Sequence, residues 1–499
     1  MKKYSILLLI AVLFAGCNDF LDLPPKNVQG IETVEDVRSL MGAYLKYVSD
    51  YNTTNYVDES FVLPWSGTTY NYTTCYSGQT MFNYISDRGT GELTNFGLGY
   101  YNWQTKYTYA AWGSCYKTIG PMNLIVDKAT EHSADNPDMA NTIIGEAKFW
   151  RAYSYFNLLQ QYAPYDSDAD GVPLFFEGHI DPVQTDLPRN TQTEVYAQIV
   201  SDLQDVLNLL NQTPADLTYN IGFNTNVVNG LMAKVYQYKA DSGAGVGSDW
   251  ENARKYADIA IAGRALYTDA AQLREMFNAA DDGYIGKECD MRVIFHEVRI
   301  KSYYGDWPDY TTDPQMEKLY QDGDIRKEAY YNEVEDWWTG DIFLVMDKFS
   351  CYDWASTANF LPIMPFRLAE LYLIKAEAQA KNNDVGSAIE TINGFRDARY
   401  SGGHLPVVGT QEQVLDSIMM ERKREFSFEY GIAWFDMKRT HAEMTRTWEV
   451  ADEEGTIEVQ TYQLEGDDFR YTFPLPDSEI LHNQSIDQDP RWEAIFDND

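Results

Sequence analysis

The stretch 365–381, PFRLAELYLIKAEAQAK, places the strongest constraint on how this chain can fold. Leu, Ala, Glu, Lys and Gln give it high helix propensity, and Pro365 suits a first helical turn, where its missing N–H costs nothing. At 100° per residue, Glu370, Glu377 and Lys381 share one narrow stripe, and apolar residues cover most of the remaining circumference. Such a helix needs neighbours on two or three sides, so the stretch predicts a helical bundle or an α-solenoid.

Apolar residues recur at helical spacing in eight further stretches, which are 32–48, 102–129, 139–162, 193–210, 226–240, 250–263, 385–399 and 411–428. The stretch 250–263 has a large-small-aromatic stripe like that of tetratricopeptide (TPR) helices. No clean period of about 34 residues is present, so the repeat is degenerate. We therefore expect a mainly α fold built from TPR-like helix pairs.

Two long regions break the helical pattern. Residues 51–101 are rich in Thr, Asn, Gly, Ser and Tyr, and residues 281–360 hold clusters of Tyr, Trp and Asp. Both are too long to be structureless connectors inside a compact domain. We expect them to be variable loop insertions with a function.

The N-terminus has the pattern of an exported lipoprotein. Two lysines precede a nine-residue apolar run at 6–14, which is too short to span a bilayer, and Ala-Gly-Cys follows, ending at Cys17. The pattern predicts a signal peptide over 1–16, lipidation of Cys17 and a tether over 17–31. An ordinary signal peptide with an incidental cysteine is the alternative.

Composition narrows the possible partners. The formal net charge of −37 argues against nucleic acid or an anionic membrane surface as the partner, and it also favours solubility. Aromatic residues make up 14% of the chain, and Tyr and Trp combine a flat apolar face with a polar edge that suits binding surfaces as well as cores. The spacing of Cys75, Cys115, Cys289 and Cys351 leaves both free thiols and disulfides open.

Several motifs occur in one order along nearly the whole chain: NDFLDLPP after Cys17, WGSCYKTIGPMN, GEAKFWRAYSYFNLLQQYA, MPFRLAELYLIKAEAQA, INGFRDAR, ERKREFSFEYG, WFDMKR and FPLPDSEI. In this series the chain resembles the SusD/RagB family of outer-membrane nutrient-binding lipoproteins. The family pattern Gly-x-Arg is absent before Trp434, where the chain has Gly431-Ile432-Ala433.

The resemblance implies one SusD-like domain over 32–499, in which about four TPR-like helix pairs support a ligand-binding face of irregular loops and short strands. It also implies a non-enzymatic role without a required cofactor. The protein would capture an oligosaccharide, or less often a peptide or glycoprotein, on the cell exterior. It would be lipid-anchored in the outer membrane and pass its ligand to a SusC-type TonB-dependent transporter.

Sugars stack their C–H patches on aromatic faces and pair their hydroxyls with polar side chains, and loops are where such residues face solvent. The candidate ligand-binding residues are therefore the loop aromatics Trp65, Tyr70, Tyr72, Tyr76, Tyr303, Tyr304, Trp307, Trp337 and Trp338. Burial of each ring under its own loop is the alternative.

The segment DSDADGVPLFFE fits the spacing of a Ca²⁺-binding loop, with Asp166, Asp168, Asp170 and Glu177 as the candidate ligands. The Pro and apolar residues after Gly171 argue against the helix that usually follows such a Ca²⁺-binding loop. A structural Ca²⁺ site and a plain Asp-rich turn both remain open.

Other chemistry finds less support. No H-x₃-H pair, CxxC, G-x-S-x-G elbow or phosphate-binding glycine loop occurs in the sequence. The 76 acidic residues still offer many chance carboxylate pairs, so a lipid-anchored glycoside hydrolase stays an alternative, as does a TPR adaptor that binds only protein. Glu370 and Glu377 are interpreted as structural ion pairs with Arg367 and Arg396.

Overall fold

The computed structural model describes residues 30–49, 73, 75–82, 92–104, 110–176, 187–214, 221–278, 293–296, 310–312, 314–335, 342–346, 348, 360–363, 367–429, 431–451 and 456–496. The fold of this part is mainly helical, as predicted, and most of its buried apolar residues form one continuous core.

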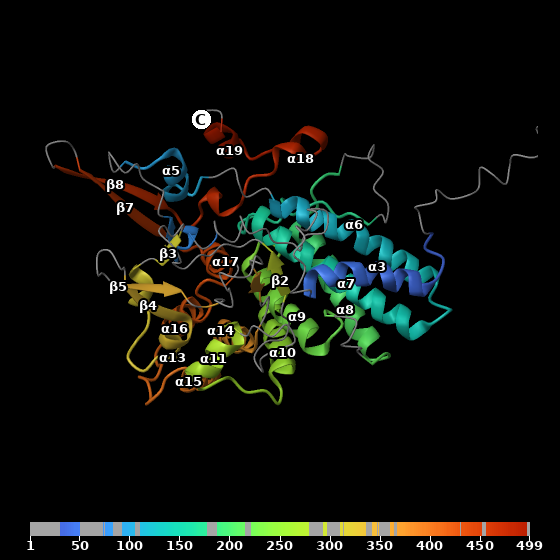
Figure 1. Ribbon diagram of the computed structural model, residues 1–499, viewed down its shortest axis with the longest axis horizontal. Coiled ribbons are helices and arrows are strands. Elements are labelled where there is room, and N and C mark those ends of the chain that lie inside the picture. The colour runs from blue at the N-terminus through green and yellow to red at the C-terminus, as the bar shows by residue number, and fades with distance from the viewer. Residues whose placement is uncertain are drawn as a thin grey trace, which may run out of the picture.

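Successive helices pack side by side in a row that runs through the molecule (Figure 1). In chain order they form TPR-like pairs, with extensive contacts within α7–α8, α9–α10 and α14–α15, and α7, α9, α14 and α16 also contact one another in that order. Helix α6 packs on α7 at one end of the row. The bounds of these helices are α6 Ala110–Glu131, α7 Pro137–Tyr162, α8 Gln192–Leu210, α9 Thr225–Asp241, α10 Asp249–Ile261, α14 Leu368–Lys381, α15 Val385–Asp397 and α16 Gln411–Glu425.

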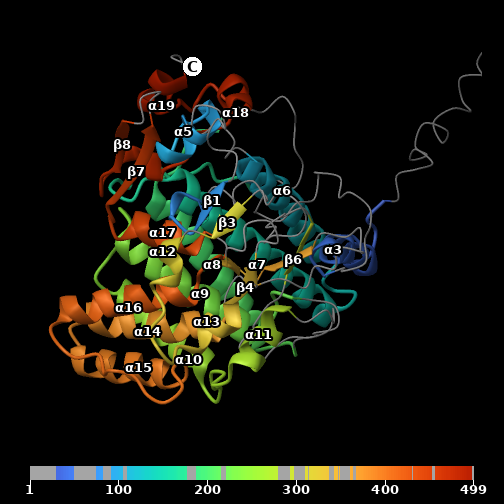
Figure 2. The ribbon, with the colours of Figure 1, turned by 60° about the vertical axis from the view of Figure 1, so that its left-hand side comes forward.

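Other helices flank this row, and all but α3 are short. They are α3 Val34–Ser49, α5 Asn95–Tyr101, α11 Ala270–Asn278, α12 Pro314–Glu317, α13 Ile325–Tyr330, α17 Ile432–Arg439, the 3₁₀ turn Phe469–Tyr471, α18 Asp477–His482 and α19 Pro490–Phe496. Helices α18 and α19 lie at the opposite end of the molecule from α15 (Figure 2).

The described strands form two-stranded antiparallel sheets, paired β1–β3, β2–β6, β4–β5 and β7–β8. Pairs β1–β3 and β2–β6 are short and join segments that are distant in sequence, and β4–β5 is a short hairpin. Strands β7 and β8 form a longer hairpin beside α5 (Figure 1). The bounds are β1 Thr80–Phe82, β2 Val293–His296, β3 Tyr310–Thr312, β4 Tyr331–Glu335, β5 Ile342–Met346, β6 Phe360–Ile363, β7 Met444–Ala451 and β8 Ile457–Leu464.

Helix α7 is the most enclosed element of the row. Asn136 accepts a hydrogen bond from the Met139 N–H, and Pro137 occupies the first turn, so the helix start is well defined. Nearly every side chain from Ile143 to Tyr162 is buried, because α6, α8 and α9 pack around it. Its C-terminal end is therefore a fixed point on which a site can be built.

Helix α14 begins at Leu368 and not at Pro365, which corrects the predicted start. Arg367 has an extended backbone, with φ −129° and ψ 160°, and no side-chain cap is present. Its guanidinium instead donates to Glu429 at 2.8 and 2.6 Å and to Glu425 at 2.9 Å. These contacts hold Arg367 outside the helix.

The structural role of Glu370 and Glu377 is confirmed, but their partners come from other helices. Glu377 pairs with Arg439 of α17 at 2.6 Å, and Glu370 pairs with Lys234 of α9 at 3.0 Å. Arg396 pairs with Glu421 of α16 at 3.2 Å. The sequence pattern of α14 could not predict these partners, because they depend on which helices pack next to α14 in the fold.

Buried charge continues beside α14. Glu425 of α16 accepts from Arg367 at 2.9 Å and from Arg399 at 3.0 Å. Burial opposes the negative charge of Glu425, yet these arginines hold its pKa well below the usual range. This layer of paired charges joins α14 to α16 inside the core.

Most predicted helices begin and end within a few residues of their observed bounds. The stretch 102–129 is an exception, because residues 102–104 form a turn and α6 starts at Ala110. Helix α5 lies inside the region expected to be irregular, and the C-terminal tail, expected as strand and turn, also holds α18 and α19. The side chains of Cys75 and Cys115 are buried as thiols. The signal peptide 1–16, Cys17, most of the tether, Cys289 and Cys351 lie outside the described residues.

Candidate functional site

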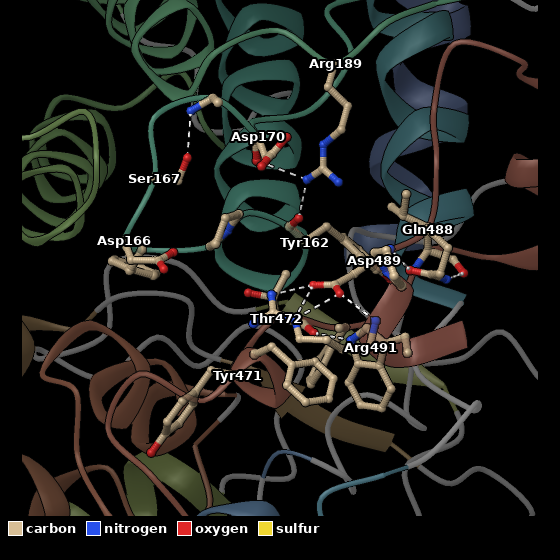
Figure 3. A pocket seen from close by; sticks show the side chains of 18 of the residues that line it. Tyr162, Asp166, Ser167, Asp170, Arg189, Tyr471, Thr472, Gln488, Asp489 and Arg491 are labelled. Carbon is tan, nitrogen blue, oxygen red and sulfur yellow. Dashed lines mark hydrogen bonds and ion pairs between the residues drawn. The ribbon is translucent and has the colours of Figure 1, made fainter. Parts of the chain in front are cut away.

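A cleft of about 810 Å³ opens where the end of α7 meets the C-terminal segment of the chain. We call it the C-terminal cleft. One wall is the turn after α7 together with Pro188 and Arg189, and the other runs from Gly466 to Trp492 (Figure 3). Among the residues that line it are Tyr162, Asp166, Ser167, Asp170, Arg189, Lys438, His441, Asp467, Asp468, Thr472, Phe473, Leu475, Ser485, Asp487, Gln488, Asp489, Arg491 and Trp492.

The turn after α7 is held against the start of α8. The Gly171 N–H donates to the Asn190 carbonyl at 2.9 Å, and a Cβ at Gly171 would lie 2.5 Å from that oxygen. The Asp168 carboxylate accepts from the Thr193 N–H at 2.7 Å and so caps the first turn of α8. Glycine and aspartate at these positions are therefore required by the turn itself.

Arg189 braces the same wall from inside. Its Nε donates to the Gly171 carbonyl at 2.8 Å, and its Nη2 donates to the Asp170 carbonyl at 3.0 Å and to the Tyr162 carbonyl. Burial lowers the pKa of Arg189, although Asp170 favours its charge. Figure 3 shows the guanidinium reaching from one wall toward the centre of the cleft.

Lys438, near the end of α17, is 2% exposed at the base of the cleft. Its Nζ donates to the Gln160 carbonyl at 2.8 Å and to the Ala163 carbonyl at 2.7 Å, which are free at the C-terminal end of α7. Burial lowers the pKa of this amine well below its usual range. The lysine thus ties α17 to α7.

The second wall is fixed by aromatic and amide contacts. Trp492 is 2% exposed, and its Nε1 donates to the Thr472 carbonyl at 3.0 Å. Gln488 accepts from the Leu475 N–H at 3.2 Å and donates to the Leu475 carbonyl at 2.9 Å. The Phe473 N–H donates to Gln161 of α7 at 2.8 Å. The C-terminal segment is therefore anchored on the helix that carries the first wall.

Acidic side chains dominate the lining. Six aspartates face two arginines and one lysine. Three of the six are paired: Asp468 with Arg470 at 2.5 Å, Asp489 with Arg491 at 2.6 Å and Asp467 with His441 at 2.8 Å. Burial disfavours the charge of Asp489, but hydrogen bonds from Arg491 lower its pKa. Polar groups of this kind suit a hydroxyl-rich ligand.

The structure describes one of the nine predicted aromatic residues, and it corrects that one. Tyr76 is 1% exposed, and its ring lies 5.2 Å from Trp434 and 6.2 Å from Tyr100. It is a core ring, and Arg446 of β7 fixes its backbone by donating to the Tyr76 carbonyl at 2.9 Å. The other eight, Trp65, Tyr70, Tyr72, Tyr303, Tyr304, Trp307, Trp337 and Trp338, lie outside the described residues.

The predicted Ca²⁺ ligands are described in part. Asp168 is committed to the cap of α8, as an Asp-rich turn requires, while Asp166 and Asp170 lie at the cleft. Within the described ranges, no group of three His, Cys, Asp or Glu side chains is arranged to hold a metal. Glu177 lies outside those ranges, so the Ca²⁺ site stays a prediction.

Sequence reasoning missed the C-terminal cleft, including Arg189, Lys438 and Trp492. The one available signal was the composition of the tail, where aspartates, an arginine and a tryptophan follow each other in SIDQDPRW. That signal does not say which distant segment the tail meets. The contact with α7 spans 278 residues of sequence between Gln160 and Lys438.

Comparisons with known proteins bear on this fold. A family described as "Starch-binding associating with outer membrane" matches residues 19–237. Two SusD-like proteins of Formosa agariphila are similar. One is 24% identical over 67% of this chain and 72% of its own length, and the other is 23% identical over 97% and 99%.

Solved structures share the architecture. A SusD superfamily protein from Bacteroides thetaiotaomicron aligns with a TM-score of 0.69 and 21% identity, covering 92% of this chain and all of the other. A SusD-like carbohydrate binding protein from Bacteroides vulgatus aligns with a TM-score of 0.66 and 20% identity, covering 91% and 97%. At these identities the likeness shows a common fold.

Within the described part of the chain, no helix is both long and apolar enough to cross a membrane. The family match over residues 19–237, the near full-length relative and the shared helical architecture agree with the ordered motifs of the sequence, so the chain is similar to SusD-like proteins in sequence and in fold.

Proposed function

We propose that this protein captures glycans at the outer membrane and does not cleave them. The observation that carries the proposal is the match of residues 19–237 to a family described by starch binding and outer-membrane association, together with one SusD-like relative matched over 97% of the chain. A similar fold from Bacteroides vulgatus is that of a carbohydrate binding protein. The open, polar C-terminal cleft offers hydroxyl-binding groups in keeping with this role.

The glycan is held in part by aromatic rings on the two loop regions, with at least one of Trp65, Trp307, Trp337 and Trp338 as a stacking platform. The protein is anchored through lipidated Cys17, faces the cell exterior and delivers its ligand to a SusC-type TonB-dependent transporter. Long-chain acylation of Cys17, tested by metabolic labelling with a palmitate analogue, should disappear in Cys17→Ala. Co-purification of an outer-membrane barrel in mild detergent tests the transporter.

Affinity electrophoresis in gels that contain soluble polysaccharides tests the binding role. We expect one polysaccharide class to retard the wild-type protein, and the variant with all four tryptophans changed to Ala to lose that retardation. Equal retardation of the two proteins would remove the stacking platform. Absence of retardation in every gel would argue for the alternative of peptide capture or protein-only binding.

A lipid-anchored glycoside hydrolase is the alternative from another class. Prolonged incubation with the retarding polysaccharide, followed by chromatography, should give no shortened products. Release of oligosaccharides would overturn the non-enzymatic assignment.

A further inference from the structure

Three carboxylates of the C-terminal cleft remain available to a ligand. Asp166, Asp170 and Asp487 are exposed, and within the described residues their side chains have no hydrogen bond or ion pair. Asp166 nevertheless lies close enough to influence Lys438 and Arg491 electrostatically, so its charge acts across the cleft. A bound ligand meets these carboxylates as unused acceptors.

The cations of the cleft are occupied by the protein itself. Arg189 donates three hydrogen bonds to backbone carbonyls of the first wall, and Lys438 donates two to carbonyls at the end of α7. Arg491 is bound to Asp489 through Nε and Nη2. An anionic ligand would therefore have to compete with the contacts that hold the first wall and the end of α7, or with the local pair of Arg491 and Asp489.

The electrostatic potential of the cleft is expected to be negative, like the charge of Asp166, Asp170 and Asp487. Six aspartates outnumber three basic side chains in the lining, and the whole chain has a formal net charge of −37. A concave site lined by one sign of charge concentrates ligands of the opposite sign and repels those of its own. The effect weakens as salt screens the charges.

The size of the cleft fits a short saccharide. About 810 Å³ falls in the range of roughly 300–1,000 Å³ that is typical of small-molecule sites. Hydroxyls of Ser167 and Ser485 lie among the carboxylates, so donors and acceptors for ring hydroxyls are both present.

We propose that the C-terminal cleft binds a short oligosaccharide that carries amino groups, with Asp166, Asp170 and Asp487 as its ammonium acceptors, and that it disfavours saccharides carrying carboxylate or sulfate. This inference rests on the proposed glycan-binding function and specifies the ligand class of one site. Neutral saccharides of the same length bind with intermediate affinity because they keep the hydroxyl contacts and lack the charge.

Isothermal titration calorimetry with three tetrasaccharide probes tests the proposal: a glucosamine oligomer, an N-acetylglucosamine oligomer and a galacturonate oligomer. At low salt we expect affinity to fall in that order. Added salt should weaken binding of the glucosamine oligomer much more than binding of the N-acetylglucosamine oligomer. Tighter binding of the galacturonate oligomer than of the glucosamine oligomer would overturn the proposal.

A pair of variants locates the effect. Asp166→Asn with Asp487→Asn removes two exposed charges from the cleft, and Asp416→Asn with Glu412→Gln removes two exposed charges from α16 outside it. We expect the cleft variant to lose about fivefold in affinity for the glucosamine oligomer, and the α16 variant to lose almost none. Equal effects of the two variants would mean that the attraction is general to an acidic protein, and the site would be rejected.

The two hypotheses fail differently. If the wild-type protein binds other glycans but the cleft variant binds the glucosamine oligomer normally, the inference about the cleft is wrong and the proposed function stands. If no glycan of any charge binds the folded wild-type protein, both are overturned. Far-UV circular dichroism of the two variants confirms that they are folded.

Discussion

The ion pair between Arg151 and Asp202 joins α7 to α8 and makes the packing of the helical row directly testable. Arg151 donates to the Asp202 carboxylate at 2.8 Å from Nε and at 2.6 Å from Nη2, and to Asn123 of α6 at 2.8 Å. The two charged side chains are 8% and 2% exposed. Burial opposes the charge of Arg151, but its hydrogen bonds to the Asp202 carboxylate raise its pKa.

Removing one partner leaves the other charged and buried. Two unit charges about 4 Å apart attract by about 4 kcal/mol at an effective dielectric constant of about 20. We therefore expect Asp202→Leu to lower the free energy of unfolding by about 3–5 kcal/mol. Arg151→Met should cost at least as much, because Asn123 also loses its donor.

The double variant Arg151→Met/Asp202→Leu removes both charges together with their desolvation penalty. We expect it to cost about 1 kcal/mol or less, which is smaller than the cost of either single substitution. Guanidinium unfolding followed by far-UV circular dichroism and tryptophan fluorescence measures all four proteins, with equal m values as the check on a common transition. A double variant whose cost equals the sum of the two singles would refute this description of the pair.

Three further predictions follow from the structure. Gly171→Ala should destabilise the protein by about 1–3 kcal/mol and weaken ligand binding in the C-terminal cleft, because the added Cβ meets the Asn190 carbonyl and moves the first wall. The control in the same thermal melts and titrations is Gly247→Ala, where an added Cβ meets nothing within 4 Å. Burial lowers the pKa of Lys348 to about 8, so between about pH 8 and 10.4 the unfolded state binds more protons than the folded state and the free energy of unfolding rises with pH. The free energy of unfolding of the wild type, relative to that of Lys348→Met, should therefore increase across this pH window. A decrease would contradict the lowered pKa of Lys348. A Ca²⁺ ion held by Asp166, Asp168, Asp170 and Glu177 predicts that EGTA lowers the thermal midpoint, whereas an unchanged midpoint assigns the segment to an Asp-rich turn.

Much of the helical framework could be predicted from local patterns. The apolar periodicity of 193–210 and 226–240 locates α8 and α9 almost to the residue, since Thr191 and Asn224 stand at their caps. The start of α14 could not be predicted, because the extended backbone of Arg367 depends on carboxylates about 60 residues away in sequence.

The candidate site was harder to foresee for the same reason. The aromatic residues of the polar loops predicted a binding surface, yet Tyr76 packs in the core against Trp434 and Phe473, which no local pattern could indicate. The Asp-x-Asp-x-Asp-Gly spacing suggested a cation, while the structure uses Asp168 to cap α8 and Gly171 to permit a close backbone approach. The C-terminal cleft arises from tertiary contacts between α7, α17 and the tail.

Calorimetric titration of the wild-type protein against a panel of soluble polysaccharides tests the central claim most directly. The account predicts saturable binding to at least one glycan class, with no shortened products after prolonged incubation. Absence of binding heat with every glycan, in a protein shown to be folded by circular dichroism, would contradict it.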